Sequence, residues 1–472
     1  MVFKSNWQNR GYDCSSTTRS IKMILALSTI CFATSMLQDT TPAIELVEPS
    51  LQWTRRAEGE NLVSLELVSR RYEVEGKPDL WLVGVAHIAD GSFYEEIAAL
   101  LDEMDIVLYE SVRPTGSRPP SGVTEEEKVA STKLSLEFVA DIAKRASEES
   151  ELIPESLEDI FADALLLDRR LAGWVEDASV DAWGRPFALQ VNEEQMSITL
   201  WSFGSDGAVG GKGSGADLTS TRLLDILTEE ELLEEEELME AGIFLDDDSV
   251  DKEEEESKGV QAELADALNL EFQLESLPYE DPNWFCSDLT IGEVEAKLVE
   301  RGADPSLLDS LTGESFVSKF AVGMMKVIPM LDKLTGGGFS ETARLLMIEV
   351  LSAPSMGEML EGFDPELSQV IIIDRNTEVL RDIASTIAVA DEISTIGVLY
   401  GAGHMEDLSS RLFELFGYLP AEDRWFSTMK VDPRKSMLDE KYMRQMRVMM
   451  QIQLKNASKN ETKDTDGKQS KE

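Results

Sequence analysis

The chain has 472 residues, enough for two to three domains, and 42% of them are hydrophobic, as expected of a globular protein. Its 91 acidic residues outnumber 43 basic ones, which gives a formal net charge of −48. A field of that sign repels nucleic acids and anionic lipid surfaces, so both are excluded as partners.

The beginning of the chain is typical of a leader. A basic segment over residues 1–22 precedes an apolar stretch, Met23–Leu37, that contains small residues. We therefore predict a signal peptide or leader over residues 1–41 and an exported protein, periplasmic or extracellular. A membrane anchor formed by an uncleaved leader and targeting to an organelle are the alternatives. No apolar run reaches the roughly 18 to 20 residues that span a bilayer, so no stable membrane span is expected in the mature chain.

Residues 42–115 predict the N-terminal half of an α/β fold. The expected elements are strands over 63–72, 80–85 and 105–109, with a helix over 93–104 between the last two. A strand–helix–strand unit of this length most simply forms a right-handed parallel crossover.

The region 116–365 predicts mainly helices, with an insertion at about 202–258 that is rich in Gly and Ser and then acidic. Within it, Asp225–Glu256 holds 17 acids against the single base Lys252. Such a stretch has little apolar surface to bury, so we predict that it is disordered and that a short linker can replace it. Gly210–Ser214 is not a phosphate loop, because Gly213 stands where Ser or Thr is required.

Residues 366–432 repeat the α/β pattern. The expected elements are strands over 370–373, 395–400 and 423–431, and helices over 377–389 and 405–416. We expect the two sequence-distant halves to join into one mixed, mainly parallel sheet, with the helical region inserted between them. Residues 433–456 predict a Met-rich helix that docks on the core or on a second subunit, which leaves a homo-oligomer open. Residues 457–472 predict a disordered tail.

Cysteine use argues against two kinds of chemistry. If the leader is removed, Cys286 is the only cysteine left, so a disulfide framework is excluded. No histidine lies near Cys286 in sequence to activate it, so we interpret it as a packing residue.

The two histidines of the chain occur in the same local frame. Gly84–His87 and Gly401–His404 both read Gly-x-x-His, and each ends a predicted buried strand and precedes a helix. Ligands of parallel sheets bind at the carboxyl ends of strands. His87 and His404 are therefore expected to share one rim with Glu110, which follows the strand over 105–109. The alternative is that both imidazoles are satisfied core groups.

The residue types at this rim suit a metal centre. Two neutral imidazoles and the carboxylate of Glu110 form a ligand set for a divalent cation such as zinc, manganese or cobalt. Such an ion activates a bound water at neutral pH. Asp374–Asn376 follows another predicted strand, and its Arg375 would stabilise an oxyanion or clamp an anionic substrate.

These motifs resemble the TraB/GumN (pheromone-shutdown) family, whose animal relatives include the Tiki proteins. The matching segments are Leu82–His87, Asp105–Glu110, Asp374–Asn376 and Gly401–His404. The resemblance covers residues 80–113 and 366–432, roughly a quarter of the chain. It implies an α/β core related to the erythromycin esterases, metal-dependent peptidase activity, and a site of His87, Glu110 and His404 joined by Arg375 and Asn376.

Three functions follow from these motifs. The leading hypothesis is a metal-dependent hydrolase, a peptidase acting outside the cytoplasm on a peptide or small-molecule substrate. The second is a metal-independent hydrolase like the erythromycin esterases, in which His87 is the general base and Glu110 positions it. The third is a binding protein that captures a peptide without turnover.

Overall fold

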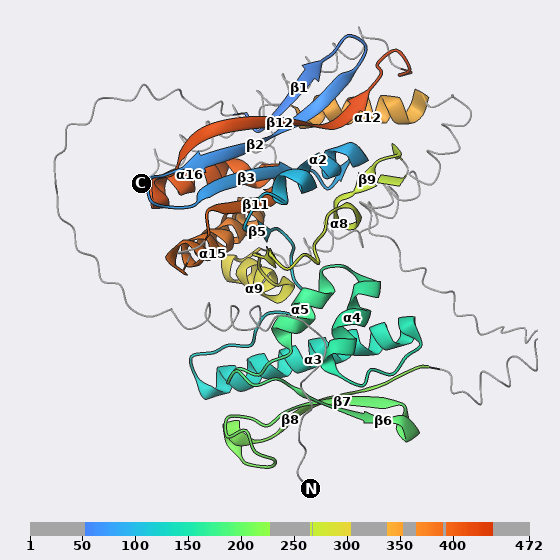
Figure 1. Ribbon diagram of the computed structural model, residues 1–472, viewed down its shortest axis with the longest axis vertical. Helices are drawn as coiled ribbons and strands as arrows, with labels where there is room; N and C mark the ends of the chain where they lie inside the picture. The colour runs from blue at the N-terminus through green and yellow to red at the C-terminus, as the bar shows by residue number, and fades with distance from the viewer. Residues whose placement is uncertain are drawn as a thin grey trace, which may run out of the picture.

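The computed structural model describes residues 52–226, 265–266, 268–303, 338–352, 365–389 and 393–437. These residues form an α/β body and, beside it, a smaller body of helices and a three-stranded sheet (Figure 1). The predictions for the leader, for residues 227–258, for the Met-rich helix beyond residue 437 and for the tail lie outside them. No helix in the described part of the chain has the length and apolar character to cross a membrane.

The α/β body is built on one mixed sheet. Its strands are β1 (Thr54–Glu58), β2 (Val63–Glu73), β3 (Asp79–Val85), β5 (Ile106–Tyr109), β10 (Trp284–Cys286), β11 (Thr395–Gly401) and β12 (Leu419–Val431). The centre is parallel, in the order β3-β11-β5-β10. β2 lies antiparallel to β3, and β1 and β12 pair antiparallel with β2. β11 of the C-terminal half lies between β3 and β5 of the N-terminal half, so the prediction of one α/β sheet from two distant halves is confirmed.

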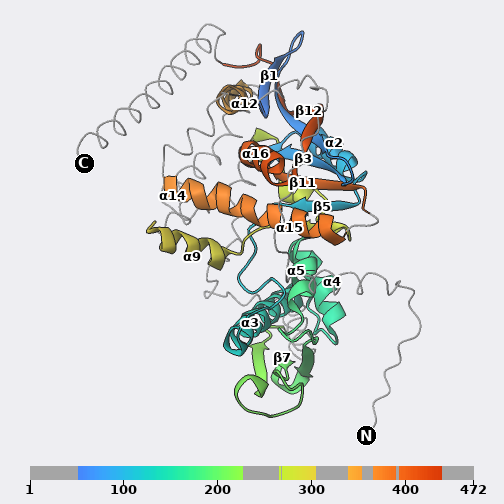
Figure 2. The ribbon, with the colours of Figure 1, turned by 90° about the vertical axis from the view of Figure 1, so that its left-hand side faces the viewer.

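Helices cover both faces of this sheet. α2 (Gly91–Leu101) lies on one side of β3 and α16 (Met405–Phe416) on the other (Figure 2). Successive strand side chains point to opposite faces. Trp81 and Val83 therefore join the core beneath α2, whereas Leu82 joins the core beneath α16 and α15 (Arg375–Val389).

The remaining elements of the α/β body lie around these layers. They are β4 (Ile88–Ala89), β9 (Glu271–Phe272), α8 (Gln273–Ser276), α9 (Ile291–Arg301), α12 (Gly338–Leu351), α14 (Pro365–Ser368), the π-helix η3 (Gln369–Asp374) and the 3₁₀ turn η4 (Ala402–His404). β4 and β9 pair antiparallel, which places Phe272 opposite Ile88. This pairing brings part of the region between the two halves next to His87.

The strand predicted over 370–373 is wrong. These residues belong to η3, which continues from α14 and into α15. Val370 is fully buried against Leu289, Val294 and Leu298. A short apolar run has the same pattern in a buried helix as in a buried strand, which explains the error. β10, which has only three residues, is the fourth parallel strand instead.

The smaller body contains most of the remaining structure. Its elements are α3 (Glu125–Ser150), α4 (Leu157–Leu167), α5 (Leu171–Ala178), β6 (Ala188–Asn192), the turn η1 (Glu193–Gln195), β7 (Ser197–Ser202), the turn η2 (Gly213–Gly215) and β8 (Leu218–Leu223). Thr124 begins α3 with a capping box to Glu127. The strands pair antiparallel in the order β6-β7-β8, and Ile198 and Leu200 pack beneath the helices.

The predicted start of the disordered insertion, at about residue 202, is too early in the chain. Residues 202–226 form an ordered loop and the strand β8. Gly211 has a φ of +88°, and a Cβ added there would lie 2.0 Å from the Gly215 carbonyl oxygen. The glycines that suggest flexibility thus permit a tight loop instead. Replacing residues 202–258 would remove β8, which counts against the expectation that a linker can replace them without cost.

Asp105 joins the beginnings of β5 and β11. Its Oδ2 accepts hydrogen bonds from the backbone N–H groups of Ser394 (2.7 Å) and Thr395 (3.0 Å) and from the Ser394 hydroxyl (2.7 Å). These bonds, led by the one from the Ser394 hydroxyl, lower the pKa of Asp105.

Replacing Asp105 by Ala removes these hydrogen bonds and should lower the free energy of unfolding. The loss should be only about 1 kcal/mol, because the carboxylate is exposed and water screens its bonds. The folded pKa is depressed, so this stabilisation is present above the unfolded-state pKa and is lost as pH falls through the folded pKa. Urea unfolding of both proteins at neutral and acid pH measures it. A difference that grows at acid pH would contradict this account.

Candidate functional site

The carboxyl ends of the four parallel strands meet at one edge of the sheet. His87 follows β3, the turn η4 with His404 follows β11, Glu110 follows β5, and Asp288 lies two residues after β10. Glu110 and His404 therefore come from neighbouring strands. Arg375 and Asn376 reach the same place from the first turn of α15, and not from a strand end as predicted.

Glu110 is at the centre of the contacts. Its Oε1 accepts a 2.6 Å hydrogen bond from Arg375 and lies 3.4 Å from His404 Nε2, while its Oε2 accepts a 2.5 Å bond from the Gly401 N–H. A Cβ at Gly401 would lie 3.2 Å from that Oε2, so glycine allows this close approach. Burial by itself would raise the pKa of Glu110, but the positive charges of His404, when its imidazole is protonated, and of Arg375 hold it well below its ordinary value. Glu110 is therefore a buried carboxylate.

Asp288 is a member of the site that the sequence did not reveal. Its carboxylate is fully buried and takes Arg375 in a two-bond pair, with Nε to Oδ1 at 2.9 Å and Nη2 to Oδ2 at 2.6 Å. Burial alone would lower the pKa of Arg375, but Glu110 and Asp288 raise it well above its ordinary value. The guanidinium thus connects two carboxylates, which differs from the predicted role of a substrate clamp.

Asn376 orients the imidazole of His404. Its Nδ2 donates to Asp407 Oδ2 (2.8 Å) and to the His404 carbonyl oxygen (3.2 Å). Because a carbonyl only accepts, the amide nitrogen must face it, and Oδ1 faces His404 Nδ1 at 2.7 Å. Nδ1 therefore carries the proton in the neutral ring, which leaves the lone pair of Nε2 directed at Glu110.

His87 lies beside this network and outside it. Its side chain is exposed, and its Nδ1 lies 3.0 Å from the Oε1 of the buried Gln273. When its imidazole is protonated, His87 also contributes to lowering the pKa of Glu110, so the ring is within electrostatic reach of that carboxylate. Sequence reasoning missed Gln273, which comes from the far end of the inserted region.

The residues meet only part of the requirement for the predicted metal centre. Ligands at about 2.0 to 2.2 Å from one ion lie roughly 3 to 4 Å apart, a spacing that His404 Nε2 and Glu110 Oε1 satisfy. Two carboxylates around one guanidinium also leave a negative charge that a cation would balance. Among the described residues, however, no group of three or more His, Cys, Asp or Glu side chains is arranged to hold a metal ion. The predicted three-ligand set is thus a two-donor pair with His87 nearby.

Cys286 is a packing residue, as expected. Burial raises the pKa of its thiol to about 12, and its Sγ donates to the Ser111 carbonyl oxygen at 3.1 Å. A thiol in this state is a poor nucleophile.

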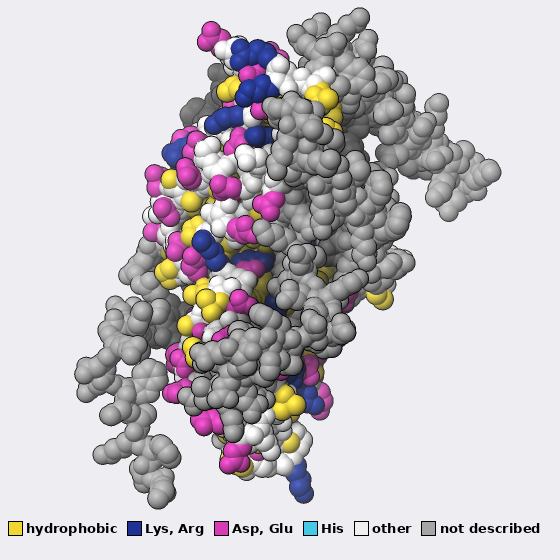
Figure 3. Space-filling model, turned by 90° about the vertical axis from the view of Figure 1, so that its right-hand side faces the viewer, with side chains coloured by type: hydrophobic (Ala, Val, Ile, Leu, Met, Phe, Trp, Pro, Cys, Tyr) yellow, Lys and Arg dark blue, Asp and Glu magenta, His cyan; other side chains and the backbone are white. Residues whose placement is uncertain are grey.

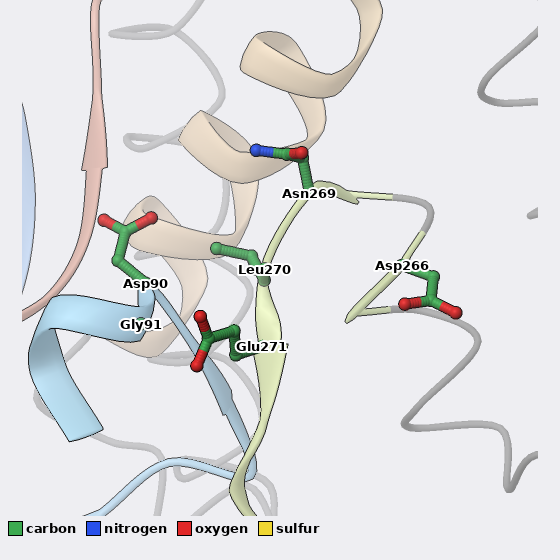
Figure 4. A pocket seen from close by; sticks show the side chains of 6 residues that line it. All are labelled: Asp90, Gly91, Asp266, Asn269, Leu270 and Glu271. Atoms are coloured by element: carbon green, nitrogen blue, oxygen red, sulfur yellow. The ribbon is translucent and has the colours of Figure 1, made fainter. Parts of the chain in front are cut away.

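A cavity of about 330 Å³ lies between the beginning of α2 and β9. Figure 4 shows its lining side chains, which include Asp90 and Glu271. Asp90 already accepts bonds from Arg344 and from the Lys430 N–H, and Glu271 accepts one from Ser276. These carboxylates are engaged within the fold, so we assign no ligand to this cavity. Elsewhere, acidic side chains are scattered over the face in Figure 3, with Lys and Arg among them.

Comparison with known proteins gives one partial match. The family model for type II secretion system (T2SS) protein G matches residues 163–221. No curated protein and no solved structure matches the chain. The matched segment runs from α4 through α5 to β8 in the smaller body, and contains none of the strand-end site residues. It covers about an eighth of the chain and does not assign the whole chain to that family.

The expected membership of the TraB/GumN family is therefore wrong. The family comparison finds T2SS protein G and not TraB/GumN. The match lies in a part of the chain that was predicted to be a helical region and a disordered loop. In the structure, buried side chains alternate with more exposed ones over Ser197–Ser202 and Leu218–Leu223, as in half-buried strands. In the sequence, Ile198 and Leu200 carry that alternation in the first segment, whereas the second segment, LTSTRL, gives no such signal.

Proposed function

We propose that the chain is a metal-dependent hydrolase, with a peptide as the leading substrate class, centred on His404 and Glu110. The observation that carries the proposal is the 3.4 Å approach of His404 Nε2 to Glu110 Oε1. With Nδ1 committed to Asn376, a lone pair of the neutral imidazole faces a carboxylate oxygen. The Nε2 lone pair and the carboxylate oxygen repel each other unless a cation, either a proton or a metal ion, lies between them.

A manganese, cobalt or zinc ion held by these two donors would supply a Lewis acid and an acidified water. The surrounding residues have distinct tasks in this scheme. Asn376 keeps Nε2 of His404 toward the site, and Arg375 with Asp288 fixes the carboxylate of Glu110. His87, exposed at the adjoining strand end, can add its free Nε2 as a further ligand or accept a proton from water.

A metal-independent hydrolase is the second candidate, and one observation favours it. His87 is exposed and its Nδ1 is held by Gln273, which leaves Nε2 available as a general base. In this scheme His87 Nδ1–H donates to Gln273 Oε1, so Gln273 takes the positioning role that was predicted for Glu110. The binding protein without turnover is the remaining alternative.

We also propose that the chain is exported. The support is the sequence pattern of residues 1–41 together with the partial match to T2SS protein G. Fractionation of the native host, followed by determination of the amino terminus of the mature protein, tests this proposal. Recovery of the unprocessed chain from the cytosol would contradict it.

The central proposal predicts a metal-dependent activity. Purified full-length protein is screened for hydrolysis of a mixed peptide library, before and after treatment with a chelator. We expect the chelator to abolish cleavage and manganese, cobalt or zinc to restore it, since the ion supplies the acidified water. The Gln195→Leu protein, altered at an exposed glutamine of the smaller body, is the matched control and should behave like wild type.

Two other results would contradict the proposal. Cleavage that survives chelation but is lost in His87→Ala would establish the metal-independent scheme. Saturable binding of peptides with no cleavage under any metal condition would establish a binding protein.

A further inference from the structure

We propose that Gln273 is a positioning residue that holds His87 in the tautomer with the proton on Nδ1 and so keeps its Nε2 free. The consequence for turnover rests on the proposed function. The tautomer itself does not, because it is argued from contacts within the fold: the Gln273 NH₂ donates to the Tyr279 hydroxyl, which turns Oε1 toward His87 Nδ1.

The two histidines have matching supports. His404 Nδ1 faces the oxygen of Asn376 at 2.7 Å, and His87 Nδ1 faces the oxygen of Gln273 at 3.0 Å. Both carboxamides are buried, with 0% of Asn376 and 2% of Gln273 exposed. Each carboxamide also donates its NH₂ group elsewhere, from Asn376 to Asp407 and from Gln273 to the Tyr279 hydroxyl. The same device therefore supports each imidazole at its own strand end.

The backbone around Gln273 holds this arrangement rigidly. The Gln273 N–H donates to the His87 carbonyl oxygen at 2.9 Å, directly after the β4–β9 pairing. The backbone at Gln273 is therefore bonded directly to the backbone at His87, and this bond fixes the position from which the Gln273 side chain reaches the His87 ring.

Tyr279 fixes the far side of the amide. Only 3% of Tyr279 is exposed, and its ring packs edge-on against Tyr109 (4.9 Å between centroids) and Trp284 (5.6 Å). Its hydroxyl, which receives the Gln273 NH₂ at 2.8 Å, thus has a defined position. An exposed histidine without such a partner would sample both tautomers and many ring orientations.

The region inserted between the two α/β halves thereby gains a role at the site. Gln273 and Tyr279 come from this region, as does Asp288 behind Arg375. The site is therefore completed by residues that neither Gly-x-x-His motif contains. A ligand-orienting partner of this kind typically changes affinity or activity by about 10- to 100-fold when it is removed.

The test uses nitrogen-15 NMR of the histidine rings. The full chain is labelled selectively at histidine and purified without a polyhistidine tag, so only two rings contribute, and the His87→Asn protein assigns them. At alkaline pH we expect His87 to show the pattern of the Nδ1–H tautomer. Gln273→Leu should lose that pattern, whereas Gln273→Glu, which keeps an acceptor oxygen, should retain it. The His404 signal should stay unchanged and reports that each variant is folded.

Two NMR results would overturn the proposal. One is a wild-type His87 in the Nε2–H form, which would show that the amide faces the other way. The other is an unchanged His87 pattern in Gln273→Leu. If that variant does not fold, Tyr279→Phe is measured instead, and it should weaken the Nδ1–H pattern without abolishing it. None of these readouts needs an active enzyme, so they succeed or fail separately from the proposed function.

Where cleavage is measured, Gln273→Leu should lower kcat by about 10-fold or more with little change in KM, and Gln273→Glu should restore much of the loss. Equal losses in both variants would indicate a structural role only and would contradict positioning.

Discussion

Replacing Arg375 by Met should lower the free energy of unfolding by about 3 to 5 kcal/mol, because it leaves Glu110 and Asp288 as buried carboxylates without their shared cation. Urea unfolding followed by circular dichroism measures the change. Arg381→Met is the matched control, since Arg381 lies in the same helix but is exposed and pairs with Glu378 on the helix surface. That control should change stability by less than about 1 kcal/mol.

The network also predicts a dependence on pH. The folded pKa of Glu110 lies well below its ordinary value, so its contribution is complete above the unfolded-state pKa and is lost as pH falls through the folded one. The difference between wild type and Arg375→Met should therefore shrink in acid. Equal small effects of the Arg375 and Arg381 substitutions at neutral pH would show that the network does not stabilise the fold.

His404→Ala and Glu110→Gln should each reduce kcat/KM by about 100-fold or more, because each removes a donor of the proposed cation pair. His87→Ala should cause a similar loss if its imidazole completes the ligand set. Rates on a peptide identified by the library screen, with manganese, cobalt or zinc in excess, measure all three. The control Gln195→Leu should keep wild-type rates.

The ratio between the two histidine variants distinguishes the enzymatic schemes. A nearly inactive His87→Ala protein alongside an active His404→Ala protein would favour His87 as a metal-free general base. That outcome would remove His404 and Glu110 from the chemistry and leave them a structural role.

Much of the sheet could be predicted because its strands are short apolar runs bounded by turn residues. The limits predicted for β3, β5 and β11 agree with the structure to within one residue, and the predicted helix over 405–416 coincides with α16. From these elements the rule that parallel strands end at one edge places Glu110 beside His404. Local pattern and topology were sufficient for that part of the site.

The parts that failed depend on contacts distant in sequence. β10 is three residues long and is defined by its pairing with β5, so Asp288 could not be placed at a strand end. Gln273 meets His87 across 186 positions of the chain. Nothing local distinguishes Val370–Ile373 in a helix from the same residues in a strand, and packing on α9 decides between them.

The family assignment failed for a related reason. A glycine followed three residues later by a polar group at a strand end satisfies the general geometry of parallel sheets, so short motifs of this kind carry little family information. The extended pattern over residues 163–221, which spans two helices and three strands, is what the family comparison recognised.

The metal content of the purified chain tests the central claim most directly. Protein dialysed against manganese, cobalt or zinc and then against metal-free buffer is analysed by mass spectrometry of its elements. We predict about one ion per chain for wild type and for Gln195→Leu, and almost none for His404→Ala and Glu110→Gln, since each substitution removes one of the two donors on which the proposed ion depends. Wild-type protein without bound metal, or equal metal content in all four proteins, would contradict the assignment of His404 and Glu110 as a metal-binding pair.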